Sequence, residues 1–281
     1  MNRFYKRIIH LLRRLQPTDW FILAALAVGA LATILVLIFR QPPDIALSKE
    51  FDPIRNRGVL RVGVRDDVVG LSFASEDEPL PIGLEASIGA AVSLRLFAQP
   101  QIEYVTVDNN TRSPKLTADS VDIVCAMFIP NSNTSFAYTE PYFTDRVLMM
   151  VPTGAAGSPA ALANTRIGAL NRAGARDVMQ NFFERNDLDI QTVLYESIPD
   201  MKFAMKMGQI SSFTLEGVII YDYADAECEV LPQSMGGISY AIAVRKEDRD
   251  MLSMCNEVID SLKTSGALED LIAACALVQH S

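Results

Sequence analysis

One stretch of the chain, Asp119–Val151, constrains the fold more than any other. It begins with an apolar run rich in Val and Ile, Val121–Phe128, which ends at a Pro-Asn-Ser-Asn turn. A polar and aromatic turn, Tyr138–Phe143, leads to a second apolar run, Arg146–Val151, which stops at Pro152. Short apolar runs bounded by Pro and Asn are typical of buried strands. The stretch therefore predicts two buried strands separated by turns.

The rest of the chain alternates between runs with strand character and runs with helical periodicity. In one expected helix, for example, Leu84, Ile88 and Ala91 fall on a single face. Alternation of this kind predicts an α/β fold. The expected strands are 59–64, 102–107, 166–170, 191–195, 218–222 and 238–244, and the expected helices are 84–97, 175–183, 199–207, 248–263 and 267–276.

The N-terminal part differs from the body of the chain in both charge and hydropathy. Residues 1–19 are basic, and the uncharged run 20–39 has the ~20 residues that a membrane-spanning helix needs. The positive-inside rule places residues 1–19 in the cytoplasm and everything after Arg40 in the periplasm, with 40–56 as a linker. A cleaved signal peptide is the alternative, but its apolar core is normally ~7–15 residues. We therefore expect a single-pass anchor in the cytoplasmic membrane.

Charge and composition exclude several classes of function. Residues 1–40 hold six of the 25 basic residues and one of the 34 acidic ones, so the body is strongly acidic. Nucleic acid is therefore not an expected partner, because phosphate binding needs clustered Lys and Arg. The two histidines, His10 and His280, lie near the ends of the chain, and no cysteine pair has metal-ligand spacing. We expect no metal, no cofactor and no Ser-His-acid catalytic set, which disfavours an enzyme.

The order of motifs in the central stretch resembles a known family. Val121–Val124, a loop, the segment Tyr138–Tyr142 and an apolar strand follow one another as in type II periplasmic solute-binding proteins, family 3, which serve amino-acid ABC transporters. Glutamate receptor ligand cores share that fold. The resemblance covers about residues 55–277. It implies a two-lobed fold of discontinuous lobes, with 57–151 and 237–281 forming one lobe and 152–236 the other.

The resemblance also indicates where ligand contacts should fall, and four of them are absent. The arginine that meets the ligand carboxylate falls on Ser132, and a nearby threonine falls on Ile129. The aromatic residue that covers the ligand falls on Val68, and the Gly-Thr-Thr segment of the second lobe falls on 172–174. The amino-acid site is thus expected to be degenerate.

One contact of the family is expected to remain. Asp222 ends the apolar run 218–222 and matches the acid that meets the ligand ammonium, although a strand-end acid can equally bond a nearby turn. Arg65, Arg112 and Arg172 are candidate replacement cations, and Arg172 is favoured because its loop faces the cleft in relatives.

These observations support a membrane-anchored, solute-binding-protein-like module that acts as a ligand-binding or accessory subunit of a membrane complex. The expected partners are a small polar solute, a membrane protein and, through residues 20–39, the lipid bilayer. A functional binding protein of an amino-acid-type ABC importer is one alternative. An enzyme of the same fold, resembling a dehydratase, is another.

The four cysteines raise the question of a disulfide, since disulfides persist outside the cytoplasm. Four cysteines allow three full pairings. The resemblance to glutamate receptor ligand cores implies a bridge between Cys228 and Cys275. Four free buried thiols are the alternative.

Overall fold

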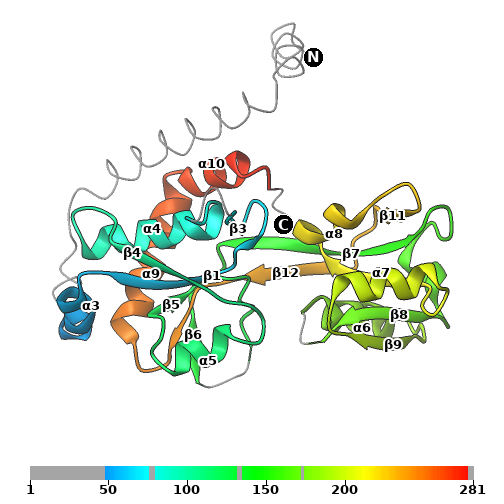
Figure 1. The fold of residues 1–281 in the computed structure, drawn as a ribbon, viewed down its shortest axis with the longest axis horizontal. Coiled ribbons are helices and arrows are strands. Elements are labelled where there is room, and N and C mark those ends of the chain that lie inside the picture. Colours follow the sequence, from blue (N-terminus) through cyan, green and yellow to red (C-terminus); the bar gives the residue numbers. More distant parts are fainter. Residues whose placement is uncertain (1–47, 76–79, 132–134, 172–173, 278–281) are drawn as a thin grey trace, which may run out of the picture.

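The computed structural model describes residues 48–75, 80–131, 135–171 and 174–277. Two separate β-sheets, each packed with helices, form two lobes that lie side by side (Figure 1). The two-lobed α/β architecture expected from the sequence is therefore confirmed. The expected membrane span 20–39, Ser132 and Arg172 lie outside the described residues.

The sheet of the first lobe has five strands in the order β4-β1-β5-β13-β6. Strand β1 pairs in parallel with both β4 and β5, whereas β13 runs antiparallel to its neighbours. The strands are β1 (Leu60–Val64), β4 (Ile102–Thr106), β5 (Ile123–Val124), β6 (Phe136–Tyr138) and β13 (Ala243–Arg245). A small hairpin of β2 (Asp67–Val68) and β3 (Ser72–Phe73) follows β1.

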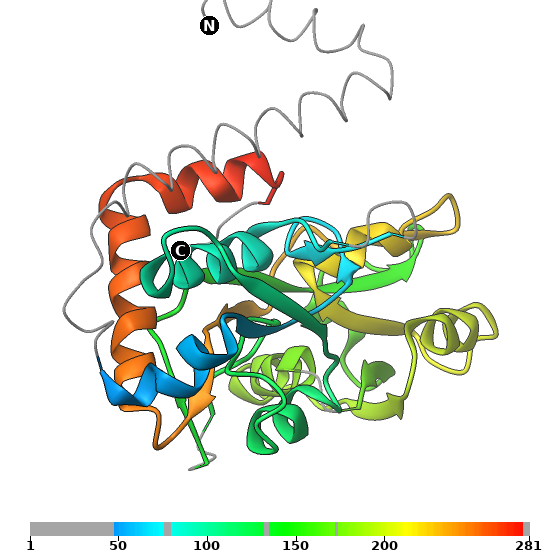
Figure 2. The ribbon, with the colours of Figure 1, turned by 60° about the vertical axis from the view of Figure 1, so that its left-hand side comes forward.

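Both faces of this sheet are buried. Successive residues of β5 enter different cores, Ile123 on the side of α4 and Val124 on the side of α5, as expected where side chains alternate between faces. Figure 2 shows α9 and α10 on the outer side of this lobe. The helices of the lobe are α3 (Asp52–Arg57), α4 (Leu84–Leu96), α5 (Arg112–Thr117), α9 (Arg249–Thr264) and α10 (Ala267–Ala274), after a short 3-10 turn, η2 (Lys49–Phe51).

The second lobe is built on the order β11-β7-β10-β8-β9, with β12 also paired to β7. Strands β8, β9 and β10 are parallel, and β7 is antiparallel to β10, β11 and β12. The strands are β7 (Phe143–Pro152), β8 (Arg166–Leu170), β9 (Gln191–Tyr195), β10 (Ser212–Glu216), β11 (Cys228–Val230) and β12 (Gly236–Tyr240). The helices are η3 (Pro159–Leu162), α6 (Gly174–Arg185), α7 (Ile198–Lys206), α8 (Gly217–Ile220) and η4 (Tyr221–Tyr223).

Two antiparallel strands, β7 and β12, join the lobes (Figure 1). Their register pairs Phe143 with Tyr240 at the end nearer the first lobe and Val147 with Gly236 at the other. The sequence placed the crossovers near 152 and 237, but β7 pairs along its whole length with strands of the second lobe. The apolar part of β7, Val147–Val151, is buried and would have the same composition in either sheet, so it does not reveal where the chain changes lobes.

The segment 218–222, expected as a strand, is instead helical. It forms α8 and η4, and the strand that ends in an acid is β10, which ends at Glu216. The backbone N–H of Val218 donates to Oδ2 of Asp145 at 3.0 Å, which satisfies a first-turn donor of α8. A short apolar run does not distinguish strand from helix by periodicity alone, which explains the wrong prediction.

The expected disulfide between Cys228 and Cys275 is not formed, because all four cysteines are free thiols. Cys228 lies on β11 in the second lobe, where its Sγ is 3.2 Å from Oδ1 of Asp225. Cys275 follows α10 in the first lobe. The two cysteines thus belong to different lobes (Figure 1). Within the described part of the chain, no helix combines the length and apolar character needed to cross a bilayer.

Candidate functional site

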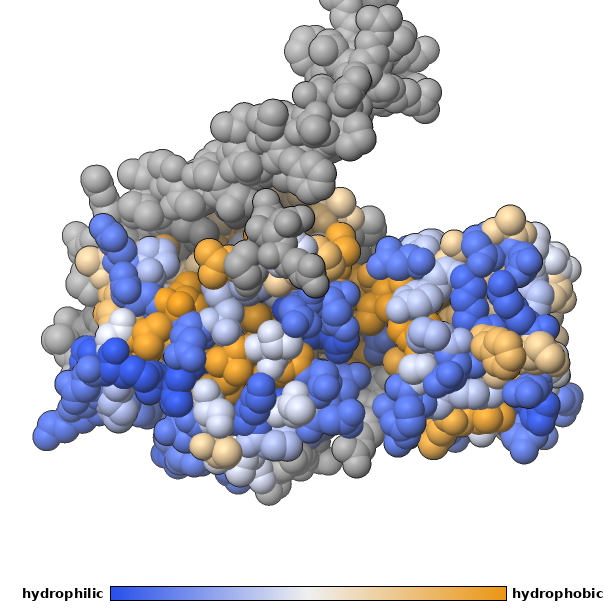
Figure 3. Space-filling view, in the orientation of Figure 1, coloured by the Kyte–Doolittle hydropathy of each residue, from blue (hydrophilic) through white to orange (hydrophobic). Residues whose placement is uncertain are grey.

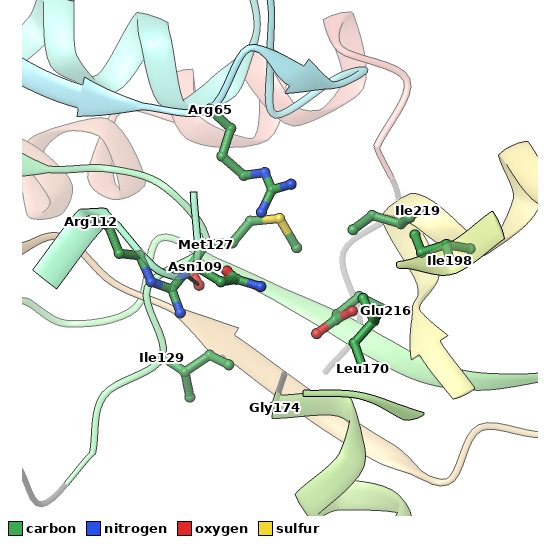
Figure 4. Close-up of a pocket in the computed structure, with 10 residues that line it drawn as sticks. All are labelled: Arg65, Asn109, Arg112, Met127, Ile129, Leu170, Gly174, Ile198, Glu216 and Ile219. Carbon is green, nitrogen blue, oxygen red and sulfur yellow. Dashed lines mark hydrogen bonds between the residues drawn. The ribbon is translucent and has the colours of Figure 1, made fainter. Parts of the chain in front are cut away.

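The carboxyl ends of the parallel strands of both sheets point to the boundary between the lobes. Arg65 directly follows β1, Met127 follows β5, and Leu170 and Glu216 end β8 and β10. This edge is where open α/β sheets bind ligands. A cavity of about 450 Å³, part of it open to solvent, lies here. Its lining comes from both lobes and consists of Arg65, Asn109, Arg112, Met127, Ile129, Leu170, Gly174, Ile198, Glu216 and Ile219 (Figure 4). The space-filling view shows a notch between the lobes (Figure 3).

Arg112 projects from the first residue of α5, and local hydrogen bonds fix the start of that helix. Oδ1 of Asp108 accepts from the backbone N–H of Asn110 and Thr111, and the Thr111 hydroxyl accepts from the N–H of Asp108. An aspartate side chain that accepts from the N–H two residues further on forms an Asx turn, which here fixes the chain just before the helix. Because α5 begins here, the Arg112 side chain is directed toward the cleft (Figure 4).

The Arg112 guanidinium is held by main-chain carbonyls. Its Nη1 donates to the carbonyl oxygens of Ala126 at 2.8 Å and Met127 at 2.9 Å, and it lies 4.6 Å from the ring centroid of Phe128. Among the described residues, Nη2 makes no hydrogen bond. Burial, followed by the positive charge of Arg65, lowers the pKa of Arg112, but an arginine stays charged at neutral pH. Arg112 thus offers a positioned donor toward the cavity.

Arg65 is the second cation on the same wall. Its Nε and Nη2 each donate to one carboxylate oxygen of Asp67 at 2.7 Å. The Arg65 side chain is 14% exposed, whereas Asp67 is 60% exposed. Burial opposes the charge of Arg65, but the hydrogen bond and charge of Asp67 outweigh it, so the pKa of Arg65 is raised. A ligand carboxylate would therefore have to displace Asp67, which is itself exposed, to reach both of these donors.

Glu216 faces the two arginines from the second lobe (Figure 4). It is 6% exposed and accepts a hydrogen bond from the backbone N–H of Ala175, in the first turn of α6. Burial, then the nearby charge of Asp145, raises the pKa of Glu216. No Lys or Arg of the described residues forms an ion pair with Glu216. A buried carboxylate without a cation is costly, so this position favours a positively charged ligand group.

Apart from the amide of Asn109, the remaining walls are apolar, and the lobes touch at one of them. A Cβ on Gly174 would lie 2.3 Å from Cδ1 of Ile129, which belongs to the opposite lobe. Only a glycine therefore allows this close approach without a side-chain shift. The cavity is thus charged at its two ends and apolar around its middle.

The structure separates the predicted site residues into three groups. Arg65 lies in the cavity, as does Arg112, which was considered as a replacement cation. Asp222 does not: it is exposed on η4 and lines a different cavity with Arg146 and Tyr221. Ser132 and Arg172 lie outside the described residues. The acid of the cavity is Glu216, which was not among the predicted site residues.

A signal for Glu216 was present in the sequence. The run Ser212–Glu216 ends in an acid and is followed at once by Gly217, which is the pattern of a strand that ends at a tight turn. The more apolar run 218–222, which lies just beyond it, was predicted as the strand instead. Among the described residues, no cluster of three or more His, Cys, Asp and Glu side chains has the arrangement of a metal site.

Two lobes joined by a pair of strands, with a charged cavity between them, define the type II periplasmic binding-protein fold. The chain belongs to the bacterial extracellular solute-binding proteins, family 3, whose family model matches residues 60–274.

Solved structures share this fold at low sequence identity. A mutant of the arginine-binding protein from T. maritima is 21% identical, with a TM-score of 0.64, over 79% of this chain and 97% of that one. An amino-acid ABC transporter substrate-binding protein from Streptococcus pneumoniae, bound to L-arginine, is 16% identical, with a TM-score of 0.66, over 83% and 100%. An ancestral amino-acid-binding protein, a precursor of cyclohexadienyl dehydratase, is 19% identical, with a TM-score of 0.65, over 80% and 98%.

Proposed function

We propose that the protein binds a small zwitterionic solute of the amino-acid type in the cavity between its lobes and presents it to a membrane transporter. The observation that carries the proposal is the arrangement of Glu216 on one lobe and Arg65 and Arg112 on the other, with no ion pair between them. A ligand ammonium group near Glu216 and a ligand carboxylate near the arginines would supply an opposite charge to each lobe. Closure of two lobes around a ligand is a common mechanism for such a fold.

The carboxylate of the solute would be held without the arginine that relatives use. Arg112 has its Nη2 available among the described residues, and Arg65 can exchange the exposed Asp67 for a ligand. After displacing Asp67, Arg65 could meet the carboxylate with two parallel hydrogen bonds, and Arg112 would add one from Nη2. Ser132 in place of the family arginine therefore does not by itself exclude amino-acid binding.

The lining also indicates what kind of side chain the solute carries. Glu216 is the single carboxylate among the ten lining residues, and five others are aliphatic or thioether side chains. A basic side chain would need a second acid, whereas Met127, Ile198 and Ile219 suit an apolar one. We therefore favour amino acids with small or aliphatic side chains over arginine or lysine.

Thermal unfolding of the purified full chain with each of the twenty amino acids tests the proposal. A ligand at a hundred times its Kd stabilises the folded state by about 2.7 kcal/mol, which raises the melting temperature by about 5–10 °C. We expect this shift with an aliphatic amino acid and a smaller one with arginine. A melting temperature that none of the twenty changes would contradict the proposal.

An accessory role without a solute is the second candidate function. It is favoured by the engagement of both cations within the protein, Arg65 with Asp67 and Arg112 with two carbonyls. The module would then bind a protein of a membrane complex. A dehydratase-like activity is a third candidate and would appear as chemical conversion of the added solute. Absence of any thermal shift, with co-purification of a membrane protein, would favour the accessory role.

The proposed function includes attachment to the membrane through residues 20–39, which follow a basic segment. Extraction of the membrane fraction with alkaline carbonate should leave the protein in the pellet, because an uncleaved spanning helix is not released by loss of peripheral contacts. A mature N-terminus beyond Arg40, found by N-terminal sequencing, would show that the segment is a cleaved signal peptide.

A further inference from the structure

Glu85 is a fully buried carboxyl group in the first turn of α4, beside the cavity but not in its lining. Its Oε1 accepts two hydrogen bonds of 2.6 Å, from the backbone N–H of Met127 and from the hydroxyl of Tyr142. Its Oε2 is buried and has no hydrogen-bond partner. Buried carboxyl oxygens are normally paired, so this oxygen requires an explanation.

One peptide group connects Glu85 to Arg112. The N–H of the Ala126–Met127 peptide donates to Glu85, and the carbonyl of the same peptide accepts from Nη1 of Arg112. Met127 itself has a φ of 47°, a left-handed conformation that is strained for a residue other than glycine. The hydrogen bond to Glu85 therefore helps to hold a turn that the backbone does not favour. Arg112 in turn takes its orientation from that turn.

We propose that Glu85 is a positioning residue for the cation wall of the cavity: it holds the turn that orients Arg112, and its protonation state sets how strongly the wall attracts an anionic group. This inference rests on the proposed function for its biological meaning. The unpartnered Oε2 is the oxygen that can take a proton while Oε1 keeps both hydrogen bonds. Protonation would remove the negative charge of Glu85 and would keep the hydrogen bonds that hold the turn.

The groups that face Glu85 determine the direction of the effect. Arg65 and Arg112 are the cations that act on it, and Tyr142, Cys125 and Tyr240 are the other titratable groups nearby. Burial raises the pKa values of Tyr142, Cys125 and Tyr240 well above their ordinary values, so these three groups stay neutral near pH 7. Burial also raises the pKa of Glu85 to about 7, against the lowering effect of its hydrogen bonds and the two arginines.

Loss of the proton from Glu85 therefore adds a negative charge beside two positive ones. The wall becomes less positive, and its affinity for a carboxylate falls as the pH rises from 6 to 8. A bound carboxylate should raise the pKa of Glu85. For each unit of that rise, the protein with Glu85 protonated binds the carboxylate tenfold more tightly than the protein with Glu85 ionised. We expect a fall of about threefold to tenfold. Glu216 adds its own pH dependence to the affinity. That contribution is the same in the wild type and in a Glu85 variant, so it cancels when the two proteins are compared.

The test uses NMR spectroscopy of the full chain in detergent, with acetate as a probe that needs only the cation wall. The Met127 amide resonance should titrate near pH 7 in the wild type and should not do so in Glu85→Gln. Acetate should bind both proteins alike at pH 6, whereas at pH 8 it should bind Glu85→Gln about threefold to tenfold more tightly. Asp222→Asn, which changes an acid outside the cavity, is the control and should follow the wild type.

The outcomes separate this inference from the proposed function. If no amino acid binds but acetate and Met127 respond as expected, the inference stands and the proposed function fails. A Met127 amide that does not titrate in the wild type overturns the inference, and this measurement needs no variant to fold. Equal acetate affinities of wild type and Glu85→Gln at both pH values, or no acetate response at all, overturn it too.

Discussion

Replacement of Glu216 by Gln is expected to weaken binding of a zwitterionic solute by about 30-fold to several thousandfold. The carboxylate is 6% exposed and has no cation of the described residues within ion-pair distance, so a ligand ammonium would supply its counter-charge. Loss of one partner of a buried charge pair costs roughly 2–5 kcal/mol, and each 1.4 kcal/mol is a tenfold change in affinity. Calorimetric titration with the amino acid that gives the largest thermal shift measures the effect.

The matched control for this prediction is Asp222→Asn. It removes the same charge by the same chemistry from a position six residues further along the chain, on exposed η4 and outside the cavity. We expect its affinity to equal that of the wild type. If Asp222→Asn lost binding and Glu216→Gln kept it, the acid of the site would be the one that the sequence first indicated.

The second large effect concerns stability rather than binding. Burial raises the pKa of Glu85 from 4.5 to about 7, so the folded state holds this proton to higher pH than the unfolded state does. For a carboxyl group with a raised pKa, the free energy of unfolding falls as the pH rises from about 4.5 to about 7. The difference between these pKa values corresponds to roughly 3 kcal/mol in total. The side chain of Glu85→Gln cannot ionise, so the free energy of unfolding of this variant does not fall in this way.

Urea unfolding at pH 5 and pH 8 measures the difference between the two proteins. Relative to the wild type, the free energy of unfolding of Glu85→Gln should rise by about 2–3 kcal/mol between these pH values. Glu103→Gln, which removes an exposed carboxylate from β4, controls for the general effect of one charge. Parallel pH profiles for wild type and Glu85→Gln would show that Glu85 ionises with little penalty inside the fold.

Much of the architecture could be predicted because hydrophobic periodicity and turn residues are local signals. Strand β8 and strand β9 were predicted with their observed bounds, and helices α4, α6 and α9 to within a few residues. The order of motifs around 119–151 was sufficient to indicate the family. At 218–222 the local signal predicted a strand, whereas the segment is helical and the backbone N–H of Val218 donates to distant Asp145.

The site was harder to predict because it depends on contacts between distant segments. Arg65 and Arg112 were named as possible cations, but only the parallel strand ends bring them to one wall. The role of Glu85 follows from its contact with Met127, which lies 42 residues away in sequence. The disulfide was inferred from a likeness to other proteins, and the placement of Cys228 and Cys275 on different lobes removes its basis.

Calorimetric titration of the purified full chain with three related compounds tests whether the cavity binds both charges of a zwitterion. The compounds are the best-binding aliphatic amino acid, the carboxylic acid that lacks its amino group and the amine that lacks its carboxylate. Because Glu216 and the arginine pair lie on opposite lobes, a compound that closes the cavity must satisfy both. We expect the amino acid to bind at least about a hundredfold more tightly than either fragment, which is roughly 2.7 kcal/mol. Equal affinities for the amino acid and one fragment, or no binding of all three, would contradict it.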